Sequence, residues 1–290
     1  MVDARFSAAN VTASQLEYLL AVLEHDSWKQ AAAEVGVSPS ALSQGLAELE
    51  RRLGVPLFDR QGRRRVPTPT AHAAGQHGTR ILAEMRELGR WAADVRGGAA
   101  GHISIGMIDT AAIHHFGDAL VEFRHDRPDV TVRLLVHPSG HLLDLLAAGE
   151  VDAVVVVDPD DDPRRSLTPL IEEPLYIYAP PGVATAERER TWVGFPRASR
   201  TRALIARGLR DLGVTYDVVA ESSQPAVLRE MVRLGMGWCV LPQTDAETEP
   251  HALTRADDAP VAVRTLALVQ RLDRSPSAAL SLLLDQITRG

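Results

Sequence analysis

Apolar residues recur at helical spacing in the first part of the chain, and short polar segments separate them. The first apolar stripe lies on one helical face and consists of Leu16, Leu19, Leu20 and Leu23. Ser14 and Glu17 form an S-x-x-E capping box at its start, and Ser27 with Gln30 repeats that start signal. The pattern therefore predicts a first helix and a second, shorter one.

A third helix is predicted from residue 39 to about residue 53. Gly36 supplies a left-handed stop for the preceding helix. Ser38 followed by Pro39 indicates an N-cap with proline at the first helical position, and Gly54 closes the helix. Together these signals predict a helix, a glycine-containing turn and another helix.

The predicted third helix has two different faces. Its apolar face consists of Leu42, Leu46, Leu49 and Leu53. The opposite face is short or polar and consists of Ser40, Ser43, Gln44 and Ala47. A helix in a DNA major groove needs small hydrogen-bonding groups near its N-terminal end, because base edges are reached only at close approach. The alternative is an ordinary amphipathic helix with a solvated face.

A basic segment follows this helix. Residues 55–60 lead into Gly62–Val66, which we expect to form a short hairpin-like wing with arginines at its tip. Arginine in a wing can neutralise phosphate and release counterions, or enter a minor groove. A solvated charge cluster is the alternative, but the position just beyond the candidate recognition helix favours DNA contact.

A long helix is predicted from Pro69, with Thr68 before it, to Arg96. At 1.5 Å per residue, about 27 residues would extend roughly 40 Å. Spacings of four and three define a coiled-coil seam of Ile81, Met85, Leu88, Ala92 and Val95, which the small residues Ala74 and Gly78 extend. The alternative is a helix packed on its own domain. In a dimer, two symmetry-related recognition helices would read a pseudo-palindromic DNA site.

The pattern changes after residue 100, where strands alternate with helices. A first set has strands at 103–106, 130–136 and 153–157, with helices at 110–125 and 141–148 between them. A second set has strands at 175–179, 215–220 and 238–241, with helices at 200–212 and 225–234. A strand at 263–269 and a helix at 277–287 are expected to rejoin the first set. This alternation predicts parallel sheets covered on both faces.

Charge separates the chain into two parts. The 290 residues have a net charge of −7. Residues 1–98 hold 12 Lys and Arg against 11 Asp and Glu, whereas the remaining residues hold 19 against 27. A basic patch on a near-neutral module, joined to an acidic body, indicates that only the first part meets phosphate.

Composition excludes several classes of protein. The single cysteine, Cys239, excludes an internal disulfide framework. No apolar run approaches the length that spans a bilayer, and residues 1–10 lack the apolar segment of a signal peptide. We therefore expect a cytoplasmic protein with no membrane partner.

Four segments of the N-terminal part match the sequence pattern of a known family, and the match spans about 60 residues in one register. They are Ala31–Ala32, Val37–Ser43, Leu49–Glu50 and Leu53–Arg60. In this register the chain resembles the winged helix-turn-helix of LysR-type transcriptional regulators. It departs from the family pattern at Gly45, Pro67 and Ala71, which bears on base preference more than on fold. The DNA-binding residues expected from the pattern and the resemblance are Ser38, Pro39, Ser40, Ser43, Gln44, Arg63, Arg64, Arg65 and Thr68.

The resemblance implies a multidomain α and α/β protein. We expect a winged helix-turn-helix at 1–68, a linker dimerisation helix at 69–98 and a two-lobed, periplasmic-binding-protein-like α/β effector domain at 99–290. The two lobes would comprise about 99–172 with 262–290, and 173–261. The glycine-rich segment Leu234–Pro242 is similar to the family's passage into a late strand. The family also implies a homodimer through the linker helix, a homotetramer, and RNA polymerase as a further partner.

Ligands of such sheets bind at the carboxyl ends of strands, against helix N-termini that favour anions. The effector-binding residues expected on this basis are Asp109, Thr110, Ser139, Ser199, Arg200, Thr201 and Ser222. Each is also explained as an ordinary cap or turn residue. An arginine with hydroxyls suits a carboxylate-bearing ligand, although Asp109 argues against a purely anionic site.

Other candidate chemistry is weaker. The aspartates at 158–162 lack the glycine and distal glutamate of an EF-hand loop, and the adjacent His114 and His115 point in different directions on a helix. We expect no metal, no cofactor and no catalytic site. A solute-binding protein or a cytoplasmic α/β enzyme are the competing hypotheses. The absence of a signal peptide argues against the first hypothesis, and the absence of a nucleophile–base pair argues against the second.

Overall fold

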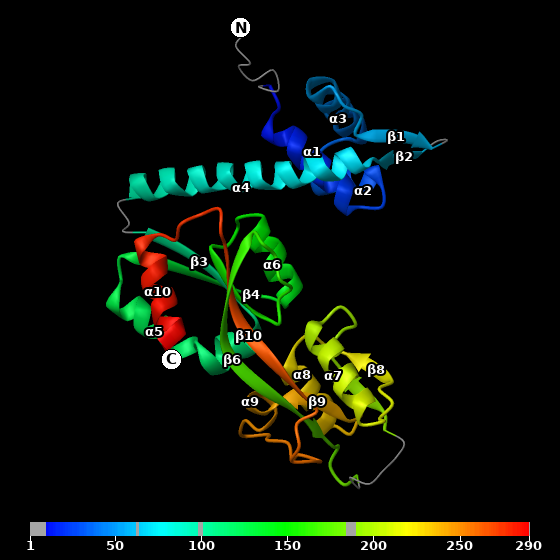
Figure 1. Ribbon diagram of the computed structural model, residues 1–290, viewed down its shortest axis with the longest axis vertical. Helices are drawn as coiled ribbons and strands as arrows, with labels where there is room; N and C mark the ends of the chain where they lie inside the picture. The colour runs from blue at the N-terminus through cyan, green and yellow to red at the C-terminus, as the bar shows by residue number, and fades with distance from the viewer. Residues whose placement is uncertain (1–9, 62–63, 98–100, 184–189, 290) are drawn as a thin grey trace. The chain divides into compact units, whose positions relative to one another are not determined.

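The computed structural model describes residues 10–61, 64–97, 101–183 and 190–289 of the chain (Figure 1). The chain divides into two compact units. Residues Met1–Ala93 belong to the first unit, and Asp94–Leu146 with Val151–Gly290 form the second. None of the described helices combines the length and apolar content that spanning a bilayer requires.

The first unit begins with α1 (Ala13–Glu24), whose start differs from the expected one. Thr12, and not Ser14, is the N-cap: its hydroxyl accepts from the Gln15 N–H, while the Gln15 side chain accepts from the Thr12 N–H. Both positions fit a capping-box pattern. The earlier one is used because Gln15 is buried and Val11 packs on the unit's core.

The next two helices are confirmed together with their caps. α2 (Trp28–Glu34) is capped by Ser27, and α3 (Pro39–Leu53) is capped by Ser38. Gly36 and Gly54 have φ of 68° and 69°, the left-handed conformation that glycine adopts at low cost. Of the four leucines on the apolar face of α3, Leu42, Leu46 and Leu49 are fully buried and Leu53 is partly buried.

A two-stranded wing and a long helix complete the first unit. β1 (Phe58–Gln61) pairs antiparallel with β2 (Arg64–Pro67), and α4 (Pro69–Gly97) follows. The small residues of α4 pack on its own unit, contrary to the extended seam that we predicted. A Cβ on Gly78 would contact the Leu16 side chain at 3.5 Å, and Ala74 packs on the first unit's core. Ile81, Met85 and Leu88 are exposed, whereas the side chains at 93–97 lie outside the described residues.

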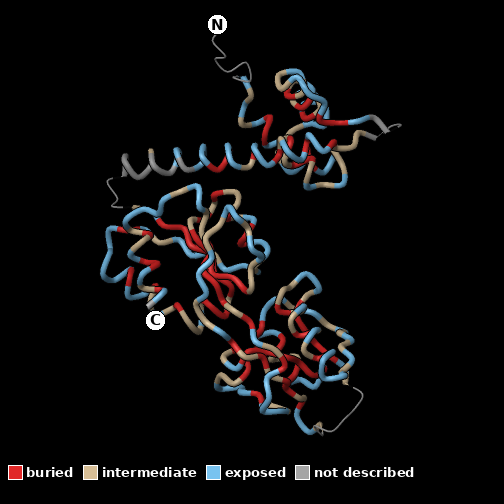
Figure 2. The backbone as a smooth tube through the Cα atoms, in the orientation of Figure 1, coloured by how far each residue is buried: buried red, intermediate tan, exposed pale blue. Residues whose placement is uncertain are grey.

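The first lobe of the second unit contains a parallel β-sheet. β3 (Gly101–Met107) lies between β4 (Val130–Val136) and β5 (Ala153–Val157), parallel to both. Every residue of β5 is buried, as a strand covered on both faces requires (Figure 2). The helices α5 (Gly117–Asp126), α6 (Ser139–Ala147) and α10 (Ala278–Arg289) accompany these strands.

The helix predicted at 110–125 is interrupted. Ala111–His115 form a π-helical turn, η1, and α5 starts only at Gly117. Phe116, between them, has φ of −119°, and a Cβ on Gly117 would lie 2.9 Å from the Ala112 carbonyl oxygen. Glycine thus permits a close approach that ends one helical segment and begins the next.

The second lobe is built from shorter elements. α7 (Arg200–Asp211) and α8 (Pro225–Arg233) occur close to their predicted bounds. β7 (Trp192–Gly194) and α9 (Gln243–Ala246) were not predicted, because three or four residues carry no readable periodicity. β7 pairs parallel with β8 (Val218–Glu221), and Trp192 bridges to Trp238 just before β9 (Cys239–Pro242).

Two long strands run from one lobe to the other (Figure 1). β6 (Arg165–Tyr178) and β10 (Ala262–Arg271) pair antiparallel, within a six-stranded sheet of order β4-β3-β5-β10-β6-β9. The expectation of parallel sheets was therefore wrong for this part, because β10 returns beside β6 in the opposite direction. Each lobe keeps its own hydrophobic core, and Cys239 is buried in the second.

Candidate nucleic-acid interface and ligand pocket

The polar face predicted for α3 forms at its N-terminal end. Ser38, Pro39, Ser40 and Gln44 are exposed and Ser43 is half-buried, on the side opposite the buried leucines. The Ser38 hydroxyl accepts from the Ala41 N–H and lies 2.9 Å from the Ser40 hydroxyl. The structure thus brings these five predicted residues together on one accessible surface.

Gly45 interrupts this face for a packing reason. A Cβ at this position would lie 2.7 Å from the Tyr18 ring, which occupies the space beside α3. Tyr18 is itself packed against the core of the first unit. The departure of Gly45 from the family pattern therefore accompanies a bulky neighbour on α1.

The wing is held to α3 by a single carboxylate. The Glu50 Oε1 atom accepts from the Leu57 N–H at 2.8 Å and from the Phe58 N–H at 3.0 Å. Thr68 is buried, and its hydroxyl donates toward the carbonyls of Pro56 and Leu57 and accepts from the Ala71 N–H. Its hydrogen bonds are thus made inside the unit, at the base of the wing and the start of α4.

Of the three wing arginines, Arg65 is the one whose side chain lies within the described residues. The Arg65 guanidinium lies 5.3 Å from the Trp28 ring centroid, and its buried Nη1 has no hydrogen-bond partner among the described residues. Trp28 in turn packs edge-on against Phe58. Arg65 thus packs back on α2. Arg63 and the side chain of Arg64 lie outside the described residues.

A pocket of about 670 Å³ lies between the two lobes of the second unit. The predicted residues that line it are Asp109, Ser139, Ser199, Arg200 and Thr201. Much of its wall is apolar and comes from Ile108, Val136, Leu143, Val157 and Phe195. A concave, mostly apolar site with a few polar groups is the usual form of a small-molecule pocket.

Two predicted residues are placed elsewhere. Thr110 is fully buried: its hydroxyl donates to Asp245 at 2.7 Å and accepts from Arg264 at 3.1 Å. Ser222 accepts from the Gln224 N–H in a turn and does not line the pocket. Both residues lie just after a predicted strand, as expected, but their side chains make hydrogen bonds outside the cavity.

The polar groups of the pocket are partly engaged already. The Ser139 hydroxyl accepts from the Val157 N–H at 3.1 Å, and Ser199 is the N-cap of α7. Burial raises the pKa of Asp109, and the nearby Asp245 adds to this against a hydrogen bond from the Thr110 N–H. The neighbouring rings of His137 and His141, 4.6 Å apart, also line the pocket. They follow the end of β4, a position that could have identified them from sequence.

Arg200 joins the two lobes at the edge of the pocket. Its Nη1 donates to the Asp160 carboxylate at 2.7 Å, and Nη2 donates to the other oxygen. This hydrogen bond, with the charge of the guanidinium, lowers the pKa of Asp160. Arg200 comes from the second lobe and Asp160 from the loop after β5, so the predicted cation is already paired.

The cation that sequence reasoning missed is Arg264, which is only 2% exposed and also lines the pocket. Its Nε donates to Glu173 at 2.7 Å, while Nη1 reaches the Thr201 hydroxyl only at 3.4 Å. Burial opposes ionisation of Glu173, but hydrogen bonds from His115 and the charge of Arg264 outweigh it and lower its pKa. An arginine inside an apolar strand pattern was the available signal.

Comparisons with known proteins agree in both parts of the chain. The family model "Bacterial regulatory helix-turn-helix protein, lysR family" matches residues 13–72, and "LysR substrate binding domain" matches residues 96–290. An uncharacterized HTH-type transcriptional regulator, YfeR of Shigella flexneri, is 28% identical over 96% of this chain and 94% of its own length.

Solved structures share the fold. CbnR in complex with its target DNA has a TM-score of 0.62 at 20% identity, over 96% of this chain and 99% of that one. A full-length OxyR variant from Pseudomonas aeruginosa has a TM-score of 0.57 at 23% identity, over 96% and 98%.

Proposed function

The chain belongs to the LysR family of transcriptional regulators, and from this premise we propose which of its residues bind DNA and which bind the effector. As a member, it is a sequence-specific DNA-binding regulator controlled by a small molecule bound between two α/β lobes. The observation that carries the assignment is the exposed polar face of α3 opposite three fully buried leucines.

In this proposal α3 enters the major groove with its N-terminal half. Ser40, Ser43 and Gln44 approach base edges, while Ser38 and Pro39 set the start of the helix. The wing arginines at 63 and 64 meet phosphate. Arg65 and Thr68 support the wing from inside the unit, by packing on Trp28 and by capping α4.

Footprinting on the DNA upstream of the chain's own gene tests this assignment. We expect Ser43→Ala to relax base preference, because it removes a group from the base-facing side. We expect Arg64→Ala to weaken binding to all sequences and to flatten its salt dependence, because one phosphate contact is lost. Ser14→Ala, an exposed serine of α1, and Arg124→Ala, an exposed arginine of α5, are the matched controls. The reverse pattern would contradict the division between helix and wing.

We also propose a dimer that pairs through α4. Ile81, Met85 and Leu88 are 47%, 51% and 63% exposed at the four–three spacing of a helical seam. A dimer predicts a footprint of two half-sites whose centres lie one helical turn of DNA, or a multiple of it, apart. The family resemblance extends the proposal to a tetramer, with RNA polymerase as a further partner and the cytoplasm as the place of action.

The effector, in this proposal, carries a carboxylate. Its acid group lies against Arg264, Thr201 and the start of α7, where helix N–H groups favour an anion. Its apolar part lies along the wall formed around Phe195. Binding shifts the lobe and subunit geometry and so the spacing of the DNA-binding pairs. The ligand is bound and not transformed, since the relatives are regulators.

A thermal-shift screen of small acids, each paired with its neutral amide, tests the effector class on the full chain. A ligand at 100 times its Kd adds about 2.7 kcal/mol of stability. For a unit of this size we therefore expect a rise of roughly 5–10 °C in melting temperature with the acid and little change with the amide. Stabilisation by amides or amines alone would contradict a carboxylate effector, and no protected DNA site would favour a solute-binding protein or an enzyme.

A further inference from the structure

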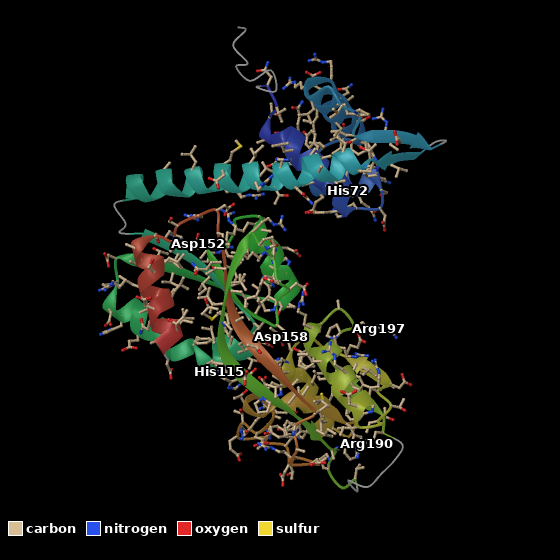
Figure 3. The ribbon with its side chains drawn as sticks, in the orientation of Figure 1. His72, His115, Asp152, Asp158, Arg190 and Arg197 are labelled. Atoms are coloured by element: carbon tan, nitrogen blue, oxygen red, sulfur yellow. The ribbon has the colours of Figure 1, made fainter. Side chains whose placement is uncertain are left out.

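Two consecutive histidines of η1 reach carboxylates beyond their own lobe. His114 Nε2 lies 3.2 Å from an oxygen of Asp245 on α9. His115, which Figure 3 labels, has its Nε2 atom 2.6 Å from an oxygen of Glu173 on β6. Neighbouring residues of a helical turn point in different directions, so each ring has its own partner. The turn that carries them is π-helical, a rare form that is frequently found at functional sites.

The two pairs belong to one buried network. Glu173 binds Arg264, Arg264 donates to Thr110, and Thr110 donates to Asp245. The side chains of Arg264, Glu173 and Asp245 are only 2%, 4% and 7% exposed. Since Arg264 also lines the pocket, whatever holds Glu173 in place also holds a pocket residue in place.

The hydrogen-bonded network of Arg264, Glu173, Thr110 and Asp245 holds two carboxylates and one guanidinium. The Arg264 guanidinium lies 2.7 Å from Glu173 but 3.9 Å from Asp245. Two buried carboxylates facing one such cation leave a negative charge, which burial makes costly. A proton on His114, whose Nε2 lies 3.2 Å from Asp245, would neutralise this charge.

Other charged groups around η1 set the balance. Arg229 on α8 donates to the Asp245 backbone carbonyl, and its charge opposes protonation of His114. Asp109, after β3, lies near Asp245 and Arg264 and adds negative charge when ionised. On the other side, His115 borders a groove that also contains Asp118 and Glu122 of α5. Acidic side chains from several elements thus lie near the two rings, together with Arg229 on α8 and, in the groove beside His115, Arg127.

We propose that η1 is a proton-dependent clasp between the lobes, in which His114 and His115 are positioning residues for the pocket. When His114 is protonated, its imidazole holds Asp245, while the His115 ring bonds Glu173, which in turn holds Arg264 at the pocket wall. When His114 is neutral, its bond to Asp245 weakens, and the two lobes are less firmly joined. The clasp does not depend on the identity of the effector.

The direction of the pH effect follows from His114. The hydrogen bond to Asp245 raises its pKa above the ordinary value of 6.5, against an opposing effect of burial. Because folding raises this pKa, the bound proton stabilises the folded form fully below the unfolded-state value. That stabilisation is lost as the pH rises through the folded-state pKa.

Melting of the full chain between pH 6.0 and 8.5, without ligand or DNA, tests the clasp. The test variant is His114→Gln, in which an amide keeps a neutral donor, and exposed His102→Gln is the control. We expect wild type to melt about 2–4 °C above His114→Gln at pH 6.0, and this difference to shrink toward pH 8.5. His102→Gln should follow wild type throughout. A difference that stays constant with pH would overturn the proposal.

A direct titration covers the case in which the glutamine variants do not fold. Imidazole NMR signals of the wild-type chain should include one that titrates above 6.5, and Asp245→Asn should lower its titration point. If every histidine of the folded chain titrates at or below 6.5, the clasp is excluded. Because this titration contains neither ligand nor DNA, a negative result excludes the clasp but does not bear on the proposed effector class, which the thermal-shift screen tests separately.

Discussion

Replacing Glu173 with leucine is expected to lower the free energy of unfolding of the second unit by about 3–5 kcal/mol, the usual cost of breaking a buried ion pair. Arg264 is 2% exposed, and Glu173 is the carboxylate that its Nε contacts at 2.7 Å. Without Glu173 the guanidinium remains buried, with the Thr110 and Thr201 hydroxyls as hydrogen-bond partners and the Asp245 carboxylate 3.9 Å away. His115 loses its partner in the same substitution.

Urea denaturation followed by tryptophan fluorescence measures this effect, because Trp192 and Trp238 are buried in the second lobe. Glu173→Gln keeps an acceptor and should cost less than the leucine variant. The double variant Glu173→Leu/Arg264→Met should regain much of the loss, because the guanidinium that lost its Glu173 partner is no longer buried there. If the double variant is no more stable than Glu173→Leu, the unpaired guanidinium is not the cause of the loss.

Replacing Glu50 with alanine is expected to destabilise the first unit by about 2–4 kcal/mol and to weaken DNA binding. Its carboxylate accepts the N–H groups of Leu57 and Phe58 with the same oxygen, Oε1. One hydrogen bond to a charged group contributes about 1.5–3 kcal/mol, and two bonds that share one oxygen at a part-buried site contribute less than twice that. These two bonds set where the wing leaves α3. Without these bonds the wing is no longer held in a fixed position relative to the recognition helix α3. The wing and α3 then do not contact DNA at the same time.

Glu48 offers a matched control on the same helix. It binds only Arg51 and Arg52 at the surface, where ion pairs contribute little, so Glu48→Ala should leave stability nearly unchanged. Circular dichroism melts and fluorescence anisotropy with upstream DNA measure both variants. Equal losses for the two glutamates would show that charge on α3, and not the position of the wing, controls binding.

Much of the first unit could be predicted because its signals are local. Ser27, Ser38, Gly36 and Gly54 each act within four residues of their own position, through caps and left-handed turns. The leucine face of α3 needs only helical periodicity. The capping box of α1 was misplaced by two residues, because the local pattern fits twice and only packing of Val11 and Gln15 decides.

The candidate pocket was less predictable from sequence. Asp109, Ser139 and Ser199 were found because strand ends and helix starts meet at one edge of a sheet. Arg264 was missed because it occupies a strand position, and its partners Glu173 and Thr110 lie 91 and 154 residues away in the chain. The direction of β10 likewise depends on its return beside β6, which no local pattern encodes.

By itself the amino-acid order determined the helices of the first unit, the face of α3 that meets solvent, the long helix and the alternating elements of the α/β lobes. These follow from interactions between residues a few positions apart. Only the tertiary structure decided that Arg65 packs on Trp28, that Gly78 contacts Leu16, and that Arg200 is paired with Asp160. The reason is physical: a side chain's partner is set by which distant segments are brought within contact distance, and that depends on the packing of the whole chain.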